Sequence, residues 1–173
     1  MKNLDHRLAW LAGIIDGEGC ISHRLARMNY VRKRDGVQSV GLDFKVSIAN
    51  TDILMVEEVT SIASAIGTKC LKYCHSNGAK SRSTGRSVWK PVWHVSFDSG
   101  KRVEAVLAAT LPYLVTKRDR AERTLAVIRY WRKARWTKGR QGGLSPSDDA
   151  WLMQQLGDLK HLNRRGPDAV EAR

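Results

Sequence analysis

The first stretch of the chain has the spacing of an amphipathic helix, with apolar residues three or four positions apart at Leu4, Leu8, Leu11 and Ile15. Asn3 or Asp5 can cap its start. Gly17 and Gly19 predict its end, because glycine weakens a helix interior and readily adopts the turns that follow a helix. The pattern therefore predicts a helix that runs from about Leu4 to Gly17.

A second face of this helix carries small side chains, at Ala9, Ala12 and Gly13. Small residues four positions apart allow the backbone of another helix to approach closely. We expect a helix–helix contact on this side, made either within one subunit or with a second copy of the chain.

Four segments with strand character follow in two pairs. Residues 20–27 and 40–48 alternate between apolar and polar or small side chains, with a charged turn at residues 32–36 between them, which predicts a β-hairpin. Residues 69–75 and 89–97 predict a second strand pair, joined by a polar, basic loop.

Helices are predicted between and after the strand pairs. Residues 50–52 supply a cap for a second helix, which Gly67 closes. A third helix covers about residues 101–110. Thr116 and Asp119 have the spacing of a capping box for a fourth helix.

A cap at Ser145 opens a last helix. The order of elements is thus α-β-β-α-β-β-α followed by two more helices, with no visible sequence repeat. This order predicts one α+β domain over residues 1–173. Its αββαββα core covers about residues 4–132, and a C-terminal helical appendage covers about residues 145–163.

The charge of the chain points to a polyanionic partner. Lys and Arg number 30 against 17 Asp and Glu, a formal net charge of +13 with a pI near 10.1. Nucleic acid is the first candidate for such a partner. Charge alone does not separate a nuclease from a repressor or a ribosomal protein.

The chain shows no membrane or secretion signal. Its longest uncharged apolar stretch, around residues 8–15, is far shorter than the roughly 20 residues of a membrane span. No basic-then-apolar leader begins it, and its three cysteines have no disulfide-framework spacing. We expect an intracellular protein, in a bacterial cytoplasm or an organelle such as a chloroplast or mitochondrion.

The segment most informative about chemistry is LAGIIDGEG, at residues 11–19. It ends an amphipathic helix by delivering two carboxylates, Asp16 and Glu18, through a glycine-rich turn. A D-G-E-G string alone is more often a plain helix end with solvated acids. The whole string, however, resembles the signature of the LAGLIDADG homing endonucleases, with six of nine letters identical. The order of elements and the later LPYLVTK segment also resemble that family.

The resemblance implies a curved antiparallel sheet that forms a DNA-binding saddle, and it implies roles for the motif residues. Glu18 matches the acidic residue that binds the divalent metal, Mg²⁺ or Mn²⁺. Gly17 matches the position whose backbone carbonyl can complete the coordination, and Asp16 looks structural. A carboxylate and a carbonyl are the hard oxygen ligands that Mg²⁺ prefers.

Two residues outside the motif also match functional positions of the family. Lys117 resembles the basic residue near the scissile phosphate, where it can offset developing charge, although a solvated lysine at a helix start is the plain alternative. Asn50 matches the polar residue that orients water. The arginine expected a few residues beyond Asn50 is absent, since Ile53 and Leu54 stand there.

The single motif copy implies a homodimer. One chain supplies one Glu18, whereas cutting both strands of DNA needs two such carboxylates. A two-fold axis would supply both, with the motif helices packed face to face along Ala9, Ala12 and Gly13.

Alternation along the strands predicts a polar sheet face that reads DNA in the major groove, because its side-chain types match base-edge chemistry. Taken singly, each residue is as consistent with a solvated position or a phosphate contact. The predicted set is Ser22, Arg24, Asp43, Lys45, Ser47, Lys72, Cys74, His94 and Ser96. Cys70 and Cys74 have no second ligand pair, which argues against a zinc site.

The favoured function is a site-specific, Mg²⁺-dependent double-strand DNA endonuclease, encoded in a mobile intron or similar element and acting at a long pseudo-palindromic site. The alternative is a non-catalytic nucleic-acid binder, such as a group I intron RNA maturase or a degenerate DNA-binding regulator. An unrelated repressor would need a helix-turn-helix, and none is as clear as the nine-letter motif.

Overall fold

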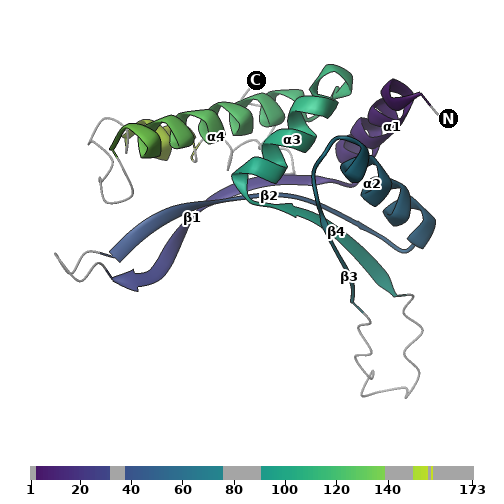
Figure 1. Cartoon of the computed structure of the whole chain (residues 1–173), viewed down its shortest axis with the longest axis horizontal. Coiled ribbons are helices and arrows are strands. Elements are labelled where there is room, and N and C mark those ends of the chain that lie inside the picture. Colours follow the sequence, from purple (N-terminus) through teal and green to yellow (C-terminus); the bar gives the residue numbers. More distant parts are fainter. Residues whose placement is uncertain (1–2, 32–37, 76–90, 139–149, 156, 158–173) are drawn as a thin grey trace, which may run out of the picture. The chain divides into compact units, whose positions relative to one another are not determined.

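The structure is a computed structural model that describes residues 3–31, 38–75, 91–138, 150–155 and 157. Its elements follow the predicted order (Figure 1). They are α1 (Leu4–Gly17), β1 (Cys20–Val31), β2 (Gln38–Asn50), α2 (Ile53–Ala65), β3 (Leu71–His75), β4 (Val92–Asp98), α3 (Gly100–Thr110), the 3-10 helix η1 (Leu111–Tyr113) and α4 (Arg118–Lys138). Residues 150–155 are also helical, and the rest of the helix predicted from Ser145 onward lies outside the described residues.

The strands form one four-stranded antiparallel sheet in the order β1-β2-β4-β3. Strand β4 lies between β2 and β3, with Ser47 opposite Ser96 on one side and Ser96 opposite Leu71 on the other. The open sheet with its helices confirms the predicted α+β class.

Contacts along the chain divide it into two compact units. The first contains Met1–Cys20 and Lys45–Thr116, and the second contains Ile21–Phe44 and Lys117–Arg173. Each unit is described by itself below.

In the first unit, helices α1, α2 and α3 share one apolar core with strands β2 and β4. Helices α2 and α3 contact β4 directly, and α1 contacts both helices. The fully buried side chains of this core include Leu11, Ile15, Val46, Ile48, Val56, Val59, Ile62, Val95, Phe97, Val103, Val106 and Leu107. Burial of this many aliphatic groups is the main force that holds the unit together.

The helix ends of the first unit follow the sequence signals. Asn3 Oδ1 accepts a hydrogen bond of 3.0 Å from the backbone N–H of Asp5, and Asp52 Oδ1 accepts one of 2.9 Å from Leu54. Gly67, after α2, has a φ of +71°, which a residue with a Cβ rarely adopts. The caps predicted around residues 3 and 52 and the glycine stop are therefore confirmed.

In the second unit, α4 packs on the strand residues through one apolar stripe. Ala121, Thr124, Leu125, Val127 and Ile128 are buried on α4. The ring of Tyr130 lies 4.2 Å from the ring of Trp151, centroid to centroid, and Leu152 is buried. Residues 150–155 therefore pack with α4 in the same core.

Some predicted boundaries differ from the structure. Helix α4 begins at Arg118, so Lys117 stands directly before its first residue and the capping box predicted at Thr116 is one position early. Strand β1 runs to Val31, four residues beyond the prediction, because the paired hairpin extends past the alternating apolar pattern. Leu4 keeps 39% of its surface exposed, since only the later turns of α1 reach the core.

A buried histidine makes the stability of the second unit sensitive to acid. His23 is 9% exposed, lies 6.0 Å from the Phe44 ring between centroids, and has its Nδ1 3.4 Å from the hydroxyl of Thr124. Its Nε2 has no hydrogen-bond partner among the described residues. Because burial penalises the charged imidazolium, the pKa of His23 falls from 6.5 to about 4.

We predict that His23 weakens the fold as the pH falls from 6.5 towards 4. In that window the unfolded chain binds a proton that the folded chain does not, so the free energy of unfolding decreases by about 2–3 kcal/mol. Urea unfolding at pH 7 and pH 4.5 measures this loss. His23→Leu should show a smaller loss between the two pH values, and an equal loss in both proteins would contradict the prediction.

Candidate active site

The motif turn is closed tightly after α1. The backbone N–H of Glu18 donates to the Ile14 carbonyl at 2.9 Å, and the N–H of Gly19 donates to the Ile15 carbonyl at 3.0 Å. A Cβ on Gly19 would lie 2.7 Å from both the Cα and the carbonyl oxygen of Ile15. Only glycine fits there, and the chain passes from the helix into β1 within two residues.

The turn places the carboxylate of Glu18 at the surface, beside the end of β2. Asn50, the last residue of β2, donates from Nδ2 to Glu18 Oε2 at 2.6 Å. The other side of the Asn50 amide is fixed, because its Oδ1 accepts from the backbone N–H of Asp52 at 2.8 Å. The structure thus brings together two residues that the sequence singled out separately, and it orients the carboxylate without neutralising its charge.

The donor set at this point suits a hard divalent cation. Glu18 is exposed and forms no ion pair with any lysine or arginine in the described part of the chain. Its carboxylate and the adjacent Gly17 carbonyl are both oxygen ligands of the kind Mg²⁺ prefers. No cluster of three His, Cys, Asp or Glu side chains occurs among the described residues.

Asp16 has a structural contact. Its Oδ2 accepts a hydrogen bond of 2.7 Å from the backbone N–H of Val115, just after η1. The end of α1 is thereby tied to the segment that follows Pro112. Lys117 lies in the second unit, directly before α4, where its carbonyl accepts from the backbone N–H of Ala121 at 2.9 Å.

The small-residue face of α1 is only partly available to a partner. Ala12 is fully buried, which is the packing within one subunit that the small residues also allow, and the contact of this face with a second copy stays a prediction. Ala12 lies one position after Leu11 and three before Ile15, which places it on the core side of the helix. Ala9 and Gly13 are exposed, and a Cβ on Gly13 would meet no atom within 4 Å.

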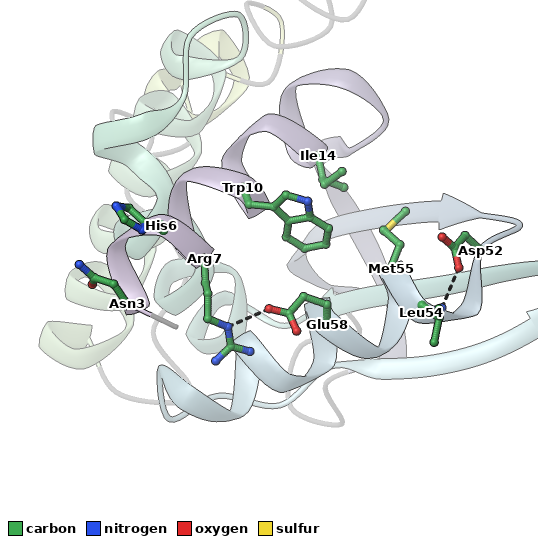
Figure 2. Close-up of a pocket in the computed structure, with 9 residues that line it drawn as sticks. All are labelled: Asn3, His6, Arg7, Trp10, Ile14, Asp52, Leu54, Met55 and Glu58. Atoms are coloured by element: carbon green, nitrogen blue, oxygen red, sulfur yellow. Dashed lines mark hydrogen bonds and ion pairs between the residues drawn. The ribbon is translucent and has the colours of Figure 1, made fainter. Parts of the chain in front are cut away.

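A groove of about 740 Å³ lies between α1 and α2 (Figure 2). An ion pair crosses between the two helices, with Arg7 Nε 2.8 Å from Glu58 Oε1. Trp10 on α1 and Leu54 on α2 are 38% and 70% exposed. The groove is lined by Asn3, His6, Arg7, Trp10, Ile14, Asp52, Leu54, Met55 and Glu58. Exposed apolar surface therefore borders the motif helix.

The sheet of the first unit has two unlike faces. One face carries the buried Val46, Ile48, Val95 and Phe97 under the helices. Because residues directly opposite in a strand pair share a face, the register assigns the other face. This open face carries Lys45, Ser47, Ala49, Leu71, Tyr73, His94, Ser96 and Asp98.

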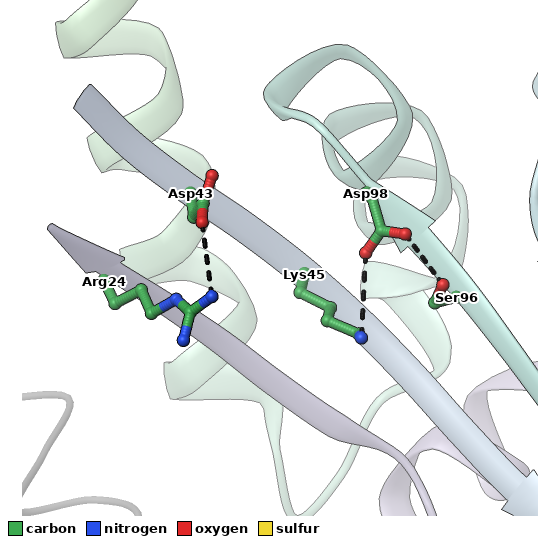
Figure 3. A network of polar contacts seen from close by, with 5 residues as sticks. All are labelled: Arg24, Asp43, Lys45, Ser96 and Asp98. Atoms are coloured by element: carbon green, nitrogen blue, oxygen red, sulfur yellow. Dashed lines mark hydrogen bonds and ion pairs between the residues drawn. The ribbon is translucent and has the colours of Figure 1, made fainter. Parts of the chain in front are cut away.

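The polar residues of the open face are linked to one another. Ser96 is 1% exposed, and its hydroxyl donates to Asp98 Oδ2 at 2.8 Å (Figure 3). Lys45 Nζ lies 3.9 Å from Asp98 Oδ1. Ser96 therefore lies on the predicted face but is too buried to meet a base, and it supports Asp98 instead.

Two predicted DNA contacts lie on the wrong face. Lys72 is opposite Val95 and Cys74 is opposite Trp93, so both point to the helix-covered side of the sheet. Lys72 Nζ lies 3.8 Å from Glu57 Oε1 and 5.8 Å from the centroid of the Trp93 ring. The alternation of Leu71 and Tyr73 with Lys72 and Cys74 predicted the opposite faces, because on this strand the apolar residues lie on the open face.

In the second unit, the predicted polar positions are on the surface. Arg24 and Asp43 are exposed, with Arg24 Nη2 3.5 Å from Asp43 Oδ2 (Figure 3), and Ser22 is half-buried. The alternating neighbours His23 and Phe44 are buried. The predicted alternation therefore holds over these residues.

The fold of the chain is found among solved structures. No model of a known protein family matches the sequence, and no curated protein is similar to it. Solved structures, however, match closely in shape. The homing endonuclease I-CvuI, in complex with the I-CreI target, superposes with a TM-score of 0.64 at 17% identity, over 95% of this chain and 86% of that chain. The chain has the LAGLIDADG homing endonuclease fold.

Two further structures with the LAGLIDADG fold differ in length. The archaeal intron-encoded I-Vdi141I, complexed with DNA, has a TM-score of 0.62 at 12% identity, over 95% of this chain and 88% of that chain. I-SmaMI, a LAGLIDADG homing endonuclease bound to cleaved DNA, has a TM-score of 0.59 at 12% identity, over 91% of this chain but only 45% of that one.

No described helix is both long and apolar enough to cross a membrane.

We predict that Asp16→Ala destabilises the LAGLIDADG fold by about 1–2 kcal/mol, because the Val115 N–H loses its acceptor. Urea unfolding at pH 7 measures the change. Asp43→Ala is the matched control, since Asp43 forms only an exposed ion pair and should cost about 0.5 kcal/mol or less. Equal effects of the two substitutions would refute the structural role of Asp16.

Proposed function

We propose that this protein is a homodimeric, divalent-metal-dependent endonuclease that cuts both strands of DNA at a long pseudo-palindromic site. The observation that carries the proposal is the exposed carboxylate of Glu18, held by Asn50 at the end of the motif helix. The similar structures, which are homing endonucleases solved in complex with DNA, support the proposed class of activity.

Glu18 and the Gly17 carbonyl would hold Mg²⁺, or Mn²⁺ in its place. When bound, the metal supplies Lewis-acid activation of the phosphate and of the attacking water. Asn50 keeps the Glu18 carboxylate in one orientation, since its amide is itself fixed by Asp52. Lys117 is proposed to offset the charge that develops on the phosphate.

The proposed dimer is supported by the single motif in this chain and by the lengths of the similar chains. One chain carries one Glu18 motif, and it spans 45% of the I-SmaMI chain but 86% of the I-CvuI chain. Two copies would therefore provide two cutting centres. We propose that Ala9 and Gly13, exposed on α1, form the contact between them, because their small side chains permit close helix packing.

DNA binding is proposed for the open face of the sheet. The net charge of +13 favours a phosphate backbone, and Lys45, Ser47 and His94 lie on that face of the first unit. In the second unit, the exposed Arg24 and Asp43 are proposed as further DNA contacts. We also propose an intracellular location, in a bacterial cytoplasm or an organelle.

A second candidate function is non-catalytic binding of nucleic acid, as in an intron RNA maturase or a DNA-binding regulator. One observation favours it: Leu54 is 70% exposed beside Asp52, at a place where the family resemblance calls for an arginine. A site that lacks this cation would stabilise phosphate charge less well.

Glu18→Gln should abolish double-strand cutting, by about a hundredfold or more, while leaving DNA binding largely intact. Glutamine keeps the size and a hydrogen-bonding oxygen but removes the charge that a metal ion needs. Cleavage in Mg²⁺ and binding without Mg²⁺ are measured on the duplex that the wild-type protein selects from a random pool.

The matched control for this substitution is Glu122→Gln, an exposed glutamate on α4 paired with Arg118 at 3.5 Å. It should cut normally. Retained cutting by Glu18→Gln would refute the catalytic assignment, and selective DNA binding by a wild-type protein that never cuts would favour the non-catalytic alternative.

Gly13→Leu should separate the subunits, because a bulky side chain on the exposed face of α1 would hold the helices apart. The dissociation constant of the dimer should rise at least about tenfold, or about 1.4 kcal/mol. The fold itself should be unaffected, since a Cβ on Gly13 meets nothing within 4 Å in one subunit. Sedimentation at several concentrations measures the mass.

Ala126→Leu adds similar bulk at an exposed position of another helix, α4, and should remain dimeric. A wild-type protein that is monomeric yet cuts both strands would overturn the two-fold arrangement.

A further inference from the structure

Two apolar side chains stand on the otherwise polar open face of the sheet. Leu71 is 50% exposed and Tyr73 is 38% exposed. The register places Leu71 opposite Ser96 and Tyr73 opposite His94, so both share a face with Lys45 and not with the apolar core. Leu71 and Tyr73 are two residues apart on this face, so their exposed side chains together offer a small apolar contact surface.

The ring of Tyr73 is held in place. It stacks on the His94 imidazole with centroids 5.0 Å apart and planes only 4° from parallel. The two stacked rings stand beside Leu71, which lies two residues along the same face of β3. A rigid surface of this kind loses little side-chain entropy when a ligand contacts it.

The opposite face of β3 fixes this arrangement. Lys72 lies between Leu71 and Tyr73 in sequence and is held on the helix side by Glu57, 3.8 Å from its Nζ, and by the Trp93 ring. A shift of one residue would turn Lys72 outward and bury Leu71 and Tyr73, and would break both contacts. The exposure of Leu71 and Tyr73 is therefore built into the strand pairing.

The proposed ligand, DNA, has an apolar group that fits the surface of Leu71 and Tyr73. In the DNA major groove, base edges present hydrogen-bond donors and acceptors and one apolar group, the 5-methyl of thymine. We propose that Leu71, with the ring of Tyr73, contacts thymine methyl groups and makes each half-site specific for thymine at one or two positions. This inference rests on the proposed function, because it assumes that the open face meets DNA.

The net charge suits DNA as the occupant. The chain carries +13, which attracts a phosphate backbone, and Lys45 lies on the same face as the apolar pair. Strand β3 is the last strand in the sheet order, so its open face can enter a groove without obstruction from a further described strand.

The test uses the duplex that the wild-type protein selects from a random pool. Each thymine is replaced in turn by deoxyuridine, which removes the methyl group and keeps the hydrogen-bonding edge. At one or two positions per half-site the wild-type dissociation constant should rise about fourfold, the effect of one lost methyl contact. Fluorescence anisotropy without Mg²⁺ measures binding.

Substitutions of Leu71 test whether its side chain causes the preference for thymine over deoxyuridine. Leu71→Ser and Leu71→Gln should bind the thymine and deoxyuridine duplexes equally at those positions, because neither side chain presents a methyl group to the thymine. Leu54→Ala, an exposed leucine on α2, should keep the wild-type discrimination.

Three results would overturn the inference. The first is a wild-type protein that tolerates deoxyuridine at every position, and the second is discrimination that persists in both Leu71 variants. The third is a Leu71 variant with unchanged DNA binding but a smaller mass in sedimentation, which would make the patch a contact between copies. A wild-type protein that selects no duplex at all would instead refute the proposed function, and this inference with it.

Discussion

The hydrogen bond from Asn50 to Glu18 joins the end of α1 to the end of β2, and the candidate site depends on it. It forms only because the chain turns within two residues after α1, where Gly19 lies against the Ile15 backbone at a distance that excludes a Cβ. A wider turn would carry Glu18 away from Asn50. The lack of room for a Cβ at Gly19 therefore determines the position of the Glu18 carboxylate.

The motif helix has two separate tasks on two faces. Leu11, Ala12 and Ile15 belong to the core, so the helix cannot rotate to offer its other side. Ala9 and Gly13 are left at the surface beside the groove that contains Trp10. Packing inside the subunit therefore fixes which part of the motif can meet a second copy, and the same packing holds Glu18 at the helix end.

Strand β3 shows how a short edge strand can be misread. Its sequence, LKYCH, alternates the apolar Leu71 and Tyr73 with Lys72 and Cys74, so alternation predicted Lys72 and Cys74 on the polar face. The observed register is the reverse, because Leu71 and Tyr73 pair with Ser96 and His94 of the open face, while Lys72 and Cys74 pair with Val95 and Trp93. The open face therefore carries Leu71 and Tyr73 in place of Lys72 and Cys74, the two residues predicted there.

The sequence by itself determined the order of helices and strands, the caps at Asn3 and Asp52, the stop at Gly67 and the family resemblance carried by residues 11–19. These are local properties: spacing, turn chemistry and a nine-letter string. The tertiary structure decided the burial of Ala12 and Ser96, the face of β3 and the meeting of Glu18 with Asn50, 32 positions apart. The burial of Ser96, the face of β3 and the contact between Glu18 and Asn50 depend on strand register and helix packing, which arise from contacts between residues far apart in the chain.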